Sequence, residues 1–243
     1  MKRLIIRSGC VASILILVFC GVCSASAEDS GQGEGWEFLA ELYFWGASIG
    51  GKSASGSAID VDLDDILDNL KFAFMGAAGV RKGKWSLIAD VIYLSVEDSD
   101  TIRGRVPVKV ELDGWIVTPF VGYNLVDTES IRLDVLGGAR YLNLEANLSL
   151  GRLRANASGS NWDGIIGVKG GVNLTEKWYL PYYLDIGAGD SEVTWQAAGG
   201  VGYRFKWFDL VAMYRYVRWD FDDNRAIDKL YFNGPFFGIK FSF

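Results

Sequence analysis

Strict alternation of apolar and polar residues is the feature that most constrains how this chain folds. Reading back from the last residue, every second side chain is large and apolar, namely Phe243, Phe241, Ile239 and Phe237. The residues between them are small or charged, namely Ser242, Lys240 and Gly238. Successive side chains of a β-strand point to opposite faces, so this stretch predicts a strand with one apolar and one polar face. We expect the apolar face to contact lipid.

The same alternation recurs in ten segments separated by polar breaks, as expected for strands with one buried face. The predicted strands are Trp36 to Ile49, Lys71 to Arg81, Trp85 to Val96, Lys109 to Leu125, Ile131 to Asn147, Ser160 to Leu174, Trp178 to Ile186, Val193 to Phe205, Phe208 to Phe221 and Leu230 to Phe243. Tight breaks alternate with longer ones, a rule of bacterial barrels, which also have even strand numbers. We therefore predict an all-β transmembrane antiparallel up-and-down barrel of ten strands over residues 36–243.

A membrane-crossing helix is not expected in the mature chain. Such a helix needs about 20 consecutive apolar residues, whereas the longest uncharged stretch after residue 27 runs only from Gly114 to Val126. The chain is nevertheless 50% hydrophobic. A closed barrel is the other structure that satisfies every backbone hydrogen bond inside lipid.

Residues 1–27 have the pattern of a secretory signal. A basic start at Lys2, Arg3 and Arg7 precedes an apolar stretch from Val11 to Val22 and small residues at positions 25–27. We expect cleavage there and a short periplasmic lead over residues 28–35. The chain would then pass through the periplasm and become integral to the outer membrane.

Cysteine usage and charge narrow the classes of site. All three cysteines lie within the expected signal, so the mature chain offers no disulfide and no thiolate metal site. Loss of the signal removes three positive charges and no negative one, which changes the formal charge from −6 to −9. An acidic chain argues against nucleic acid as a partner. No metal and no cofactor is expected.

The charges of the predicted strands share the parity opposite to the apolar stripe. A charge at the lipid midplane costs about 2–4 kcal/mol, so we expect these charges to face the lumen. There are nine acidic and seven basic residues in this set: Glu37, Glu41, Arg81, Asp90, Glu111, Asp113, Arg132, Asp134, Arg140, Asp163, Lys169, Asp185, Arg204, Asp209, Arg215 and Lys240. Unpaired charges are costly in a narrow interior, so we expect interlocked ion pairs that largely fill it.

Histidine is absent from all 243 residues. Outer-membrane hydrolases and acyltransferases of this size depend on a histidine as a general base or as part of a catalytic pair. A lysine beside Ser95 or Ser149 is the alternative base, but no spacing in the sequence suggests one. We therefore predict no catalytic residue and expect that the chain is not an enzyme.

The first outer connection, Gly50 to Leu70, contains an acidic run followed by an apolar pattern. A short helix with Asp64 as its N-cap would carry one apolar face, formed by Leu63, Ile66, Leu67 and Leu70. We expect this helix to cover the outer mouth. A calcium loop over Asp60 to Asp65 is the alternative, because alternate carboxylates can converge on a hard cation. That pattern lacks the glycine and the final glutamate of such loops.

Basic residues gather in two other outer connections, namely Arg103, Arg105, Lys109, Arg152 and Arg154. Lipopolysaccharide phosphates would pair with them, and solvated loops whose charges serve solubility are the alternative. We expect outer-membrane lipids and lipopolysaccharide as partners. We also expect a monomer, because no lipid-facing stripe is unusually polar.

Three segments, Tyr43 to Gly46, Val61 to Gly76 and Arg81 to Trp85, resemble uncharacterised Gram-negative outer-membrane proteins of the broad OmpA-like barrel superfamily. The resemblance covers about the first third of the mature chain, with a weaker match at the Phe243 end. It implies location and fold and carries no catalytic residue. Small barrels of this type usually have eight strands, which is the alternative to ten.

The last residues also resemble the terminal signal read by the barrel-assembly machinery, through Gly238, Phe241 and Phe243. Two functional hypotheses follow from all these patterns. The first is a non-catalytic outer-membrane barrel with a charged, largely filled lumen and a structural or outer-loop interaction role. The second is a passive, porin-like channel for small solutes, in which the inward charges line water instead of pairing. The sequence identifies no ligand.

Overall fold

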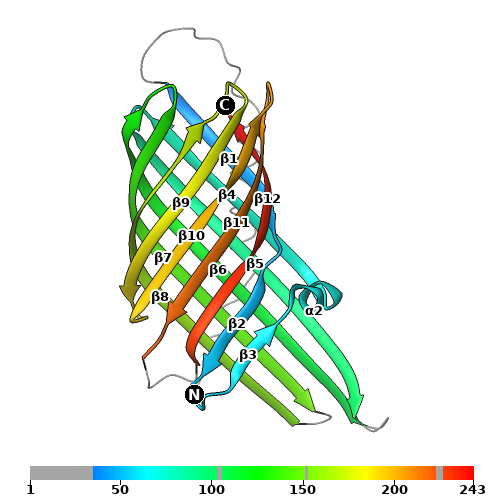
Figure 1. Cartoon of the computed structure of the whole chain (residues 1–243). Helices are drawn as coiled ribbons and strands as arrows, with labels where there is room; N and C mark the ends of the chain where they lie inside the picture. The colour runs from blue at the N-terminus through cyan, green and yellow to red at the C-terminus, as the bar shows by residue number, and fades with distance from the viewer. Residues whose placement is uncertain (1–34, 103–105, 151–152, 223–226) are drawn as a thin grey trace, which may run out of the picture. The chain divides into compact units, whose positions relative to one another are not determined.

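The computed structural model describes residues 35–102, 106–150, 153–222 and 227–243. In this part of the chain, ten antiparallel strands close into a barrel (Figure 1). The prediction of an all-β up-and-down barrel is confirmed, and ten strands are correct where eight were the alternative. The predicted signal over residues 1–27 lies outside the described residues, as does all but the last residue of the predicted lead over 28–35.

Ten long strands form the wall, and three short elements branch from it. The wall consists of β1 (Trp36–Trp45), β4 (Leu70–Lys82), β5 (Trp85–Ile102), β6 (Val106–Asp127), β7 (Ile131–Leu150), β8 (Leu153–Asn173), β9 (Trp178–Gly189), β10 (Val193–Arg204), β11 (Asp209–Asp220) and β12 (Ile227–Ser242). The short elements are β2 (Ser48–Ser53), β3 (Ala58–Val61) and the helix α2 (Leu63–Asp68). Among the described residues, no helix has the length and apolarity to span a membrane.

The barrel closes between β1 and β12. The register runs from Leu39 opposite Ser242 to Trp45 opposite Phe236. At the end of this seam, Phe38 and Phe243 exchange two backbone hydrogen bonds of 3.0 Å each. All three residues of the predicted assembly signal therefore lie along the seam, where Gly238 is opposite Tyr43 and Phe241 is opposite Ala40. Strands cross a bilayer only when such an edge is paired.

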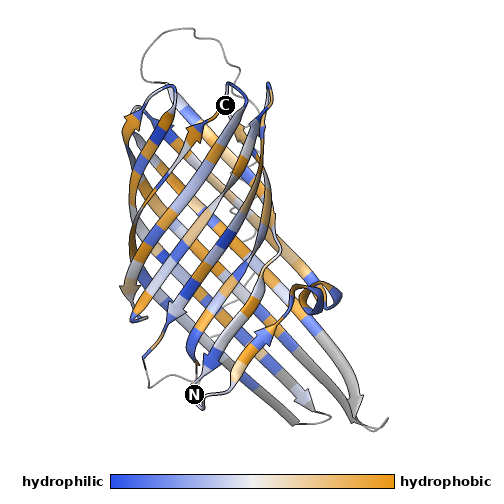
Figure 2. Cartoon of the chain, viewed as in Figure 1, coloured by the Kyte–Doolittle hydropathy of each residue, from blue (hydrophilic) through white to orange (hydrophobic). Residues whose placement is uncertain are grey.

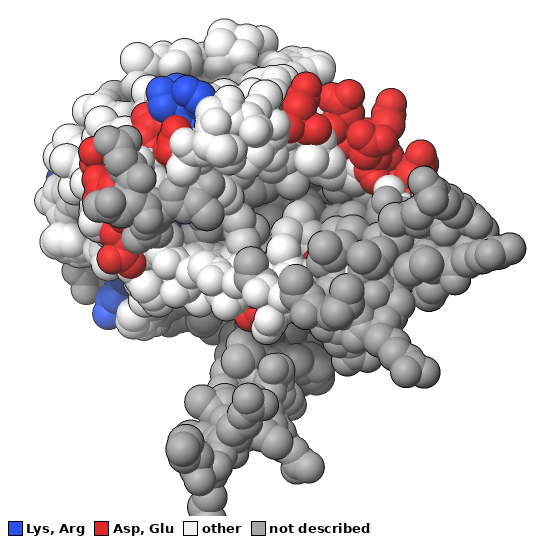
Figure 3. Space-filling model, turned by 90° about the horizontal axis from the view of Figure 1, so that it is seen from below, with Lys and Arg blue, Asp and Glu red and all other residues white. Residues whose placement is uncertain are grey.

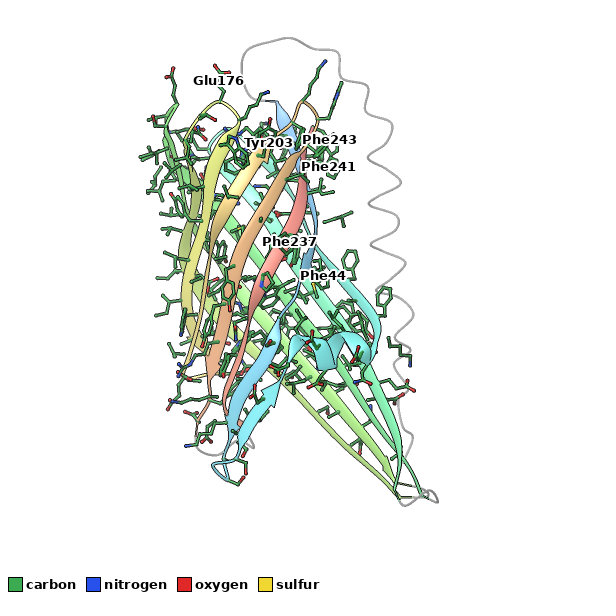
Figure 4. The ribbon with its side chains drawn as sticks, turned by 45° about the vertical axis from the view of Figure 1, so that its right-hand side comes forward. Phe44, Glu176, Tyr203, Phe237, Phe241 and Phe243 are labelled. Carbon is green, nitrogen blue, oxygen red and sulfur yellow. The ribbon has the colours of Figure 1, made fainter. Side chains whose placement is uncertain are left out.

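Hydrophilic and hydrophobic residues alternate along the strands (Figure 2). On β1, Leu42 and Phe44 are 49% and 43% exposed, whereas Trp45 is 3% exposed. Figure 4 shows Phe44 and Phe237 along the β1–β12 seam, where they are paired in register. This pattern is what a hydrocarbon exterior requires of a barrel.

Aromatic side chains mark both membrane boundaries. At the end with the tight turns, Trp36, Trp85 and Trp178 are exposed, and Figure 4 shows Tyr203, Phe241 and Phe243 near the same end. Toward the other end, Tyr93 contacts Phe72 and Trp115, with ring centroids 5.9 and 4.4 Å apart. Aromatic rings settle at the headgroup level, so the hydrocarbon belt lies between these two bands.

The predicted strands left outer loops between Val96 and Lys109 and between Asn147 and Ser160. This prediction is wrong, because the strands of the wall continue through most of both segments. β5 extends to Ile102 and β6 begins at Val106, while β7 extends to Leu150 and β8 begins at Leu153. A membrane-crossing strand needs about 9–11 residues, and β6 has 22. These four strands therefore extend well beyond the bilayer. Polar residues break the apolar alternation there, because no lipid is present to require it.

The wall parts near this outer end. β1 pairs with β4 only from Trp36 opposite Lys82 to Leu42 opposite Gly76. Farther out, β2 keeps the β1 register against β12 and takes β3 as its other neighbour. α2 connects the two branches and lies between them in Figure 1.

The helix differs from the prediction at its start. It begins at Leu63, so its N-cap is Asp62 instead of Asp64, and Asp62 makes no capping hydrogen bond through its side chain. The acidic side chains of this connection stay exposed, and Figure 3 shows acidic residues along the rim of the outer end. Among the described residues, no group of three or more acidic, cysteine or histidine side chains is arranged to hold a metal ion.

Gly138→Val tests the close contact between β7 and β6. A Cβ atom at Gly138 would lie 2.2 Å from the carbonyl oxygen of Pro119 and 2.7 Å from the Cα of Phe120. Backbone atoms cannot move aside as a flexible side chain can, so we expect the free energy of unfolding to fall by about 1–3 kcal/mol. Urea unfolding of the refolded protein measures this loss. Gly137→Val is the matched control, since its Cβ would meet only the Ile165 oxygen at 3.9 Å. Equal losses in both variants would contradict the steric explanation.

Candidate functional site

Two buried arginines meet at mid-height in the lumen. Arg140 on β7 is 0% exposed, and Arg215 on β11 is 4% exposed. Arg140 donates hydrogen bonds to the carboxylate of Asp185 on β9 and, on β10, to Thr194 Oγ1 at 3.1 Å. It also donates to Gln196 Oε1 at 3.3 Å. One guanidinium therefore ties three strands together.

Arg215 forms the second half of this network. It donates to Asp90 Oδ2 on β5 at 2.7 Å and to the Tyr43 hydroxyl on β1 at 3.2 Å. Tyr43 donates its own proton to Asp90. Arg215 also donates to Gln196 Oε1 at 3.0 Å, so the same amide oxygen accepts from both arginines. We call these four residues, together with Arg140 and Asp185, the luminal network.

The luminal network crosses the barrel and balances its own charge. Its residues come from β1, β5, β7, β9, β10 and β11, and β5 and β11 lie four places apart around the wall of ten strands. Two guanidinium groups face two carboxylates, 2.7 Å apart in the Arg215–Asp90 pair. Buried ion pairs persist only with good geometry and further hydrogen bonds. Thr194, Gln196 and Tyr43 supply further bonds to the two arginines, whereas Asp185 Oδ1 and the Nε of each arginine are buried without a partner among the described residues.

Two tryptophans pack on the arginines. The Trp45 ring lies 4.9 Å from the guanidinium carbon of Arg215, and the Trp219 ring lies 5.8 Å from that of Arg140. Trp219 is 0% exposed. A guanidinium is attracted to the face of an indole, more strongly where water is excluded. Both rings lie on outward-running strands, Trp45 beyond Tyr43 on β1 and Trp219 beyond Arg215 on β11. They therefore separate the charges from the outer half of the lumen.

Asp163 is a buried acid held by neutral donors. It is in register with Arg140 across β7 and β8. Its Oδ1 accepts from the Ser191 backbone N–H at 2.9 Å and from the Ser191 hydroxyl at 2.7 Å, and its Oδ2 accepts from Asn161 at 2.6 Å. Such bonds to a carboxylate are charge-assisted and strong, so they compensate its burial.

Several predicted inward charges pair in the periplasmic half. Arg81 lies 2.7 Å from Glu37 across β4 and β1. Arg132 lies 3.5 Å from Asp134 and 3.7 Å from Asp127. Partly exposed pairs of this kind contribute little stability compared with the luminal network.

Other charges in the periplasmic half lie against aromatic rings or opposite charged residues on the neighbouring strands. Arg204 lies 4.5 Å from the Tyr179 ring, and Tyr179 donates to Asp209 at 2.9 Å. The Lys169 ammonium lies 5.0 Å from the Phe120 ring. Lys240 on β12 is in register with Glu41 on β1 and with Asp209 on β11. In the inner half of the lumen, these polar groups lie beside a buried apolar cluster of Phe120, Leu136 and Ile165.

The prediction that Glu111 and Asp113 face the lumen is wrong, because in the outer part of β6 both side chains face outward. Both line a surface groove with Phe72 and Tyr93, and the Tyr93 hydroxyl lies 3.2 Å from Asp113 Oδ1. The lumen receives Leu112 and other apolar neighbours instead. The physical reason is their height, because an outward charge beyond the hydrocarbon belt carries no lipid penalty. Of the basic residues expected to meet lipopolysaccharide, Arg103, Arg105 and Arg152 lie outside the described residues.

The outer half of the lumen is apolar, a feature that was not predicted from the sequence. Ile92, Ile116 and Leu142 are at most 6% exposed and form one cluster with Trp45 and with Ile66 of α2. Ile92, Ile116, Trp45 and Ile66 line a cavity of about 50 Å³, here called the apolar chamber. A signal for it existed in the sequence: Ile92 has the parity of Asp90, and Leu142 has that of Arg140.

Similarity to known proteins appears among solved structures. No protein-family model matches it, and no curated protein matches it. Among similar solved structures, the attachment invasion locus protein Ail of Yersinia pestis is 12% identical, with a TM-score of 0.42 over 86% of this chain and 99% of that one. The outer-membrane protease OmpT of Escherichia coli is 11% identical, with a TM-score of 0.46 over 90% and 99%. Neisserial surface protein A is 16% identical, with a TM-score of 0.37 over 87% and 100%.

These neighbours are outer-membrane barrels of Gram-negative bacteria. The chain is an integral outer-membrane β-barrel. The predicted location and the resemblance to outer-membrane barrels are confirmed. The signal, the narrower OmpA-like assignment and the porin-like character stay predictions.

The prediction that the chain is not an enzyme requires correction. OmpT, an outer-membrane protease, is among the structural neighbours. The expectation drawn from the lack of histidine is therefore withdrawn. At this identity the likeness concerns the fold, so no activity is transferred from it.

Arg140→Leu tests the energy held in the luminal network. The substitution leaves the Asp185 carboxylate buried without its arginine, so we expect a loss of about 3–5 kcal/mol in the free energy of unfolding. Urea unfolding of the refolded protein measures it. The double variant Arg140→Leu/Asp185→Leu should recover much of that loss. Glu37→Gln is the control, because its partly exposed pair should cost about 0–1 kcal/mol. A loss below that of the control would show that the buried pair is not stabilising.

Proposed function

We propose that this outer-membrane barrel is closed along its axis and acts through its outer end, not as a passive channel. The carrying observation is Gln196, which accepts hydrogen bonds from Arg140 and Arg215 at 3.3 and 3.0 Å and so completes a bridge across the lumen. An arginine that lined a water-filled channel would have its guanidinium group exposed to solvent. Arg140 has none of its surface exposed.

The size of the barrel supports a closed axis. An eight-stranded barrel has an interior that side chains just fill, whereas porins with an aqueous channel have about 16–18 strands. Ten strands are close to the first case. Trp45 and Trp219 add two of the largest side chains directly against the arginines.

The outer end supplies the surface for action. β5, β6, β7 and β8 continue beyond the membrane-spanning part, and the β2–β3 hairpin and α2 stand opposite them around the outer end (Figure 1). Long outer segments on a rigid scaffold are where binding functions concentrate. Membrane lipids and lipopolysaccharide are the partners we propose for this end, with a monomeric barrel.

Single-channel recording tests the closed axis. We expect the wild-type protein, refolded into a planar bilayer, to show no steady conductance. Arg140→Ala/Arg215→Ala removes both halves of the bridge and should produce steady conductance steps, because two large side chains then leave the lumen. Glu37→Gln is the control and should stay silent, since Glu37 lies at the periplasmic end of the lumen.

The opposite result supports the channel hypothesis. Steady wild-type conductance that falls when Arg140 or Arg215 is replaced would mean that both side chains line a water path. Circular dichroism of each variant shows whether the barrel has formed before its conductance is compared.

A further inference from the structure

The apolar chamber lies beside an opening in the barrel wall. The pairing of β4 with β1 ends at Gly76. The outer segment of β4, from Leu70 to Met75, therefore pairs only with β5 among the described strands. β3 pairs with β2 and, in the part of the chain that the structure describes, has no strand on its other edge. Two strand edges therefore face each other without a ladder between them.

The corner of this opening has an unusual contact. The backbone N–H of Trp45 donates to Met75 Sδ at 3.2 Å, where a strand ladder would offer a backbone carbonyl. A thioether is a weak acceptor. The pairing of β1 with β4 therefore weakens toward the outer end. The backbone ladder ends at Leu42 and Gly76, and the hydrogen bond from Trp45 to Met75 Sδ follows it.

The chamber is continuous with the outer surface of the barrel at this opening. Its lining includes Ile92 and Ile116, which are buried in the lumen. It also includes Phe44 on β1 and Leu67 on α2, each 43% exposed. One apolar surface thus begins on the lipid-facing side and ends inside the barrel.

The height of the opening matches the outer boundary of the membrane. Phe72 lies on the open segment of β4, is 56% exposed and belongs to the outer aromatic band through Tyr93. Phe44 lies nearer the middle of the bilayer, in register with Phe237. Aromatic bands sit at the headgroup level, so hydrocarbon chains of the outer leaflet reach the opening.

The interior suits hydrocarbon better than water. A volume of about 10–15 Å³ admits one water molecule, and the chamber has about 50 Å³. Apolar cavities stay dry and take up apolar molecules. The buried Nε1 of Trp45 has no hydrogen-bond partner among the described residues, so it can donate to one oxygen of a bound molecule.

The cover of the chamber is lightly held. α2 has six residues, of which only Ile66 is buried, and its N-cap makes no side-chain hydrogen bond. A helix this short is unstable without packing. Displacement of α2 would therefore enlarge the chamber at small cost.

We propose that the apolar chamber binds a single hydrocarbon chain, which enters sideways from the membrane between β3 and β4. The chain lies between α2 and the inner faces of β5, β6 and β7, outside the luminal network. Its source is either a membrane lipid or a free amphiphile, because both present the same chain to the opening. This proposal does not depend on whether the axis conducts.

Photo-crosslinking in proteoliposomes tests the proposal. One set contains a phospholipid with a diazirine in its acyl chain, and the other contains a free fatty acid with the same group. We expect labelling of luminal residues such as Ile116 and Leu144, in addition to lipid-facing residues such as Ile166. Luminal labelling by the phospholipid identifies a membrane lipid, and luminal labelling by the fatty acid alone identifies a free amphiphile.

Gly114→Leu fills the chamber from its wall. A Cβ atom at Gly114 would meet Leu144 Cδ2 at 3.2 Å and nothing else closer than 3.9 Å, and the end of a leucine side chain can move by this amount. The new side chain takes the space of about two methylene groups or more, so we expect luminal labelling to fall about tenfold. Labelling of Ile166 should not change.

Gly137→Leu is the matched control. It adds the same side chain on the lipid-facing side of β7, where a Cβ has open space apart from the Ile165 oxygen at 3.9 Å. Luminal labelling should stay at the wild-type level. The proposal is overturned if both probes label only lipid-facing residues of the wild type, or if Gly114→Leu and Gly137→Leu label the lumen equally. Heat-dependent migration in gel electrophoresis shows that each variant is folded.

Discussion

Closure of the backbone hydrogen-bond ladder is the constraint on which this structure depends. Lipid offers no partner to an N–H or a carbonyl group, so a strand edge inside the bilayer must be paired. Phe38 and Phe243 meet this requirement with two mutual hydrogen bonds at the end of the β1–β12 seam. Closure then leaves each side chain only two directions, toward lipid or toward the lumen. Charged residues within the hydrocarbon belt therefore go inward, where Arg140 and Arg215 are almost completely buried.

The sequence could predict this direction but not the partners that the charges find there. Parity along a strand is local, so the alternation around Arg140 and Arg215 was enough to orient them. Partners depend on the tilt and stagger of the closed wall, which no single strand encodes. Gln196 and Tyr43 carry no charge, so parity gave no reason to select them. They nevertheless supply the oxygens on which the guanidinium groups converge.

The sequence also predicted the strands less well beyond the membrane boundary. Alternation reflects lipid on one face, and beyond the aromatic bands that cause disappears. The outer parts of β5 to β8 therefore looked like loops, although their backbones still pair into the wall. For the same reason, parity did not predict the direction of Glu111 and Asp113. Their charges face outward at a height where no hydrocarbon surrounds the barrel. The ladder continues in this region, but the sequence pattern that reveals it does not.

The apolar chamber and the opening in the wall have one common origin. An apolar layer in the outer half of the lumen would face water at the mouth unless something covered it. The helix that provides this cover has its own apolar face, and Ile66 is buried only because that layer is present. α2 belongs to the connection between β3 and β4, so it can reach the layer only if these strands do not pair with each other. The wall parts there because the cover passes through it, and the same separation brings the chamber into contact with the membrane.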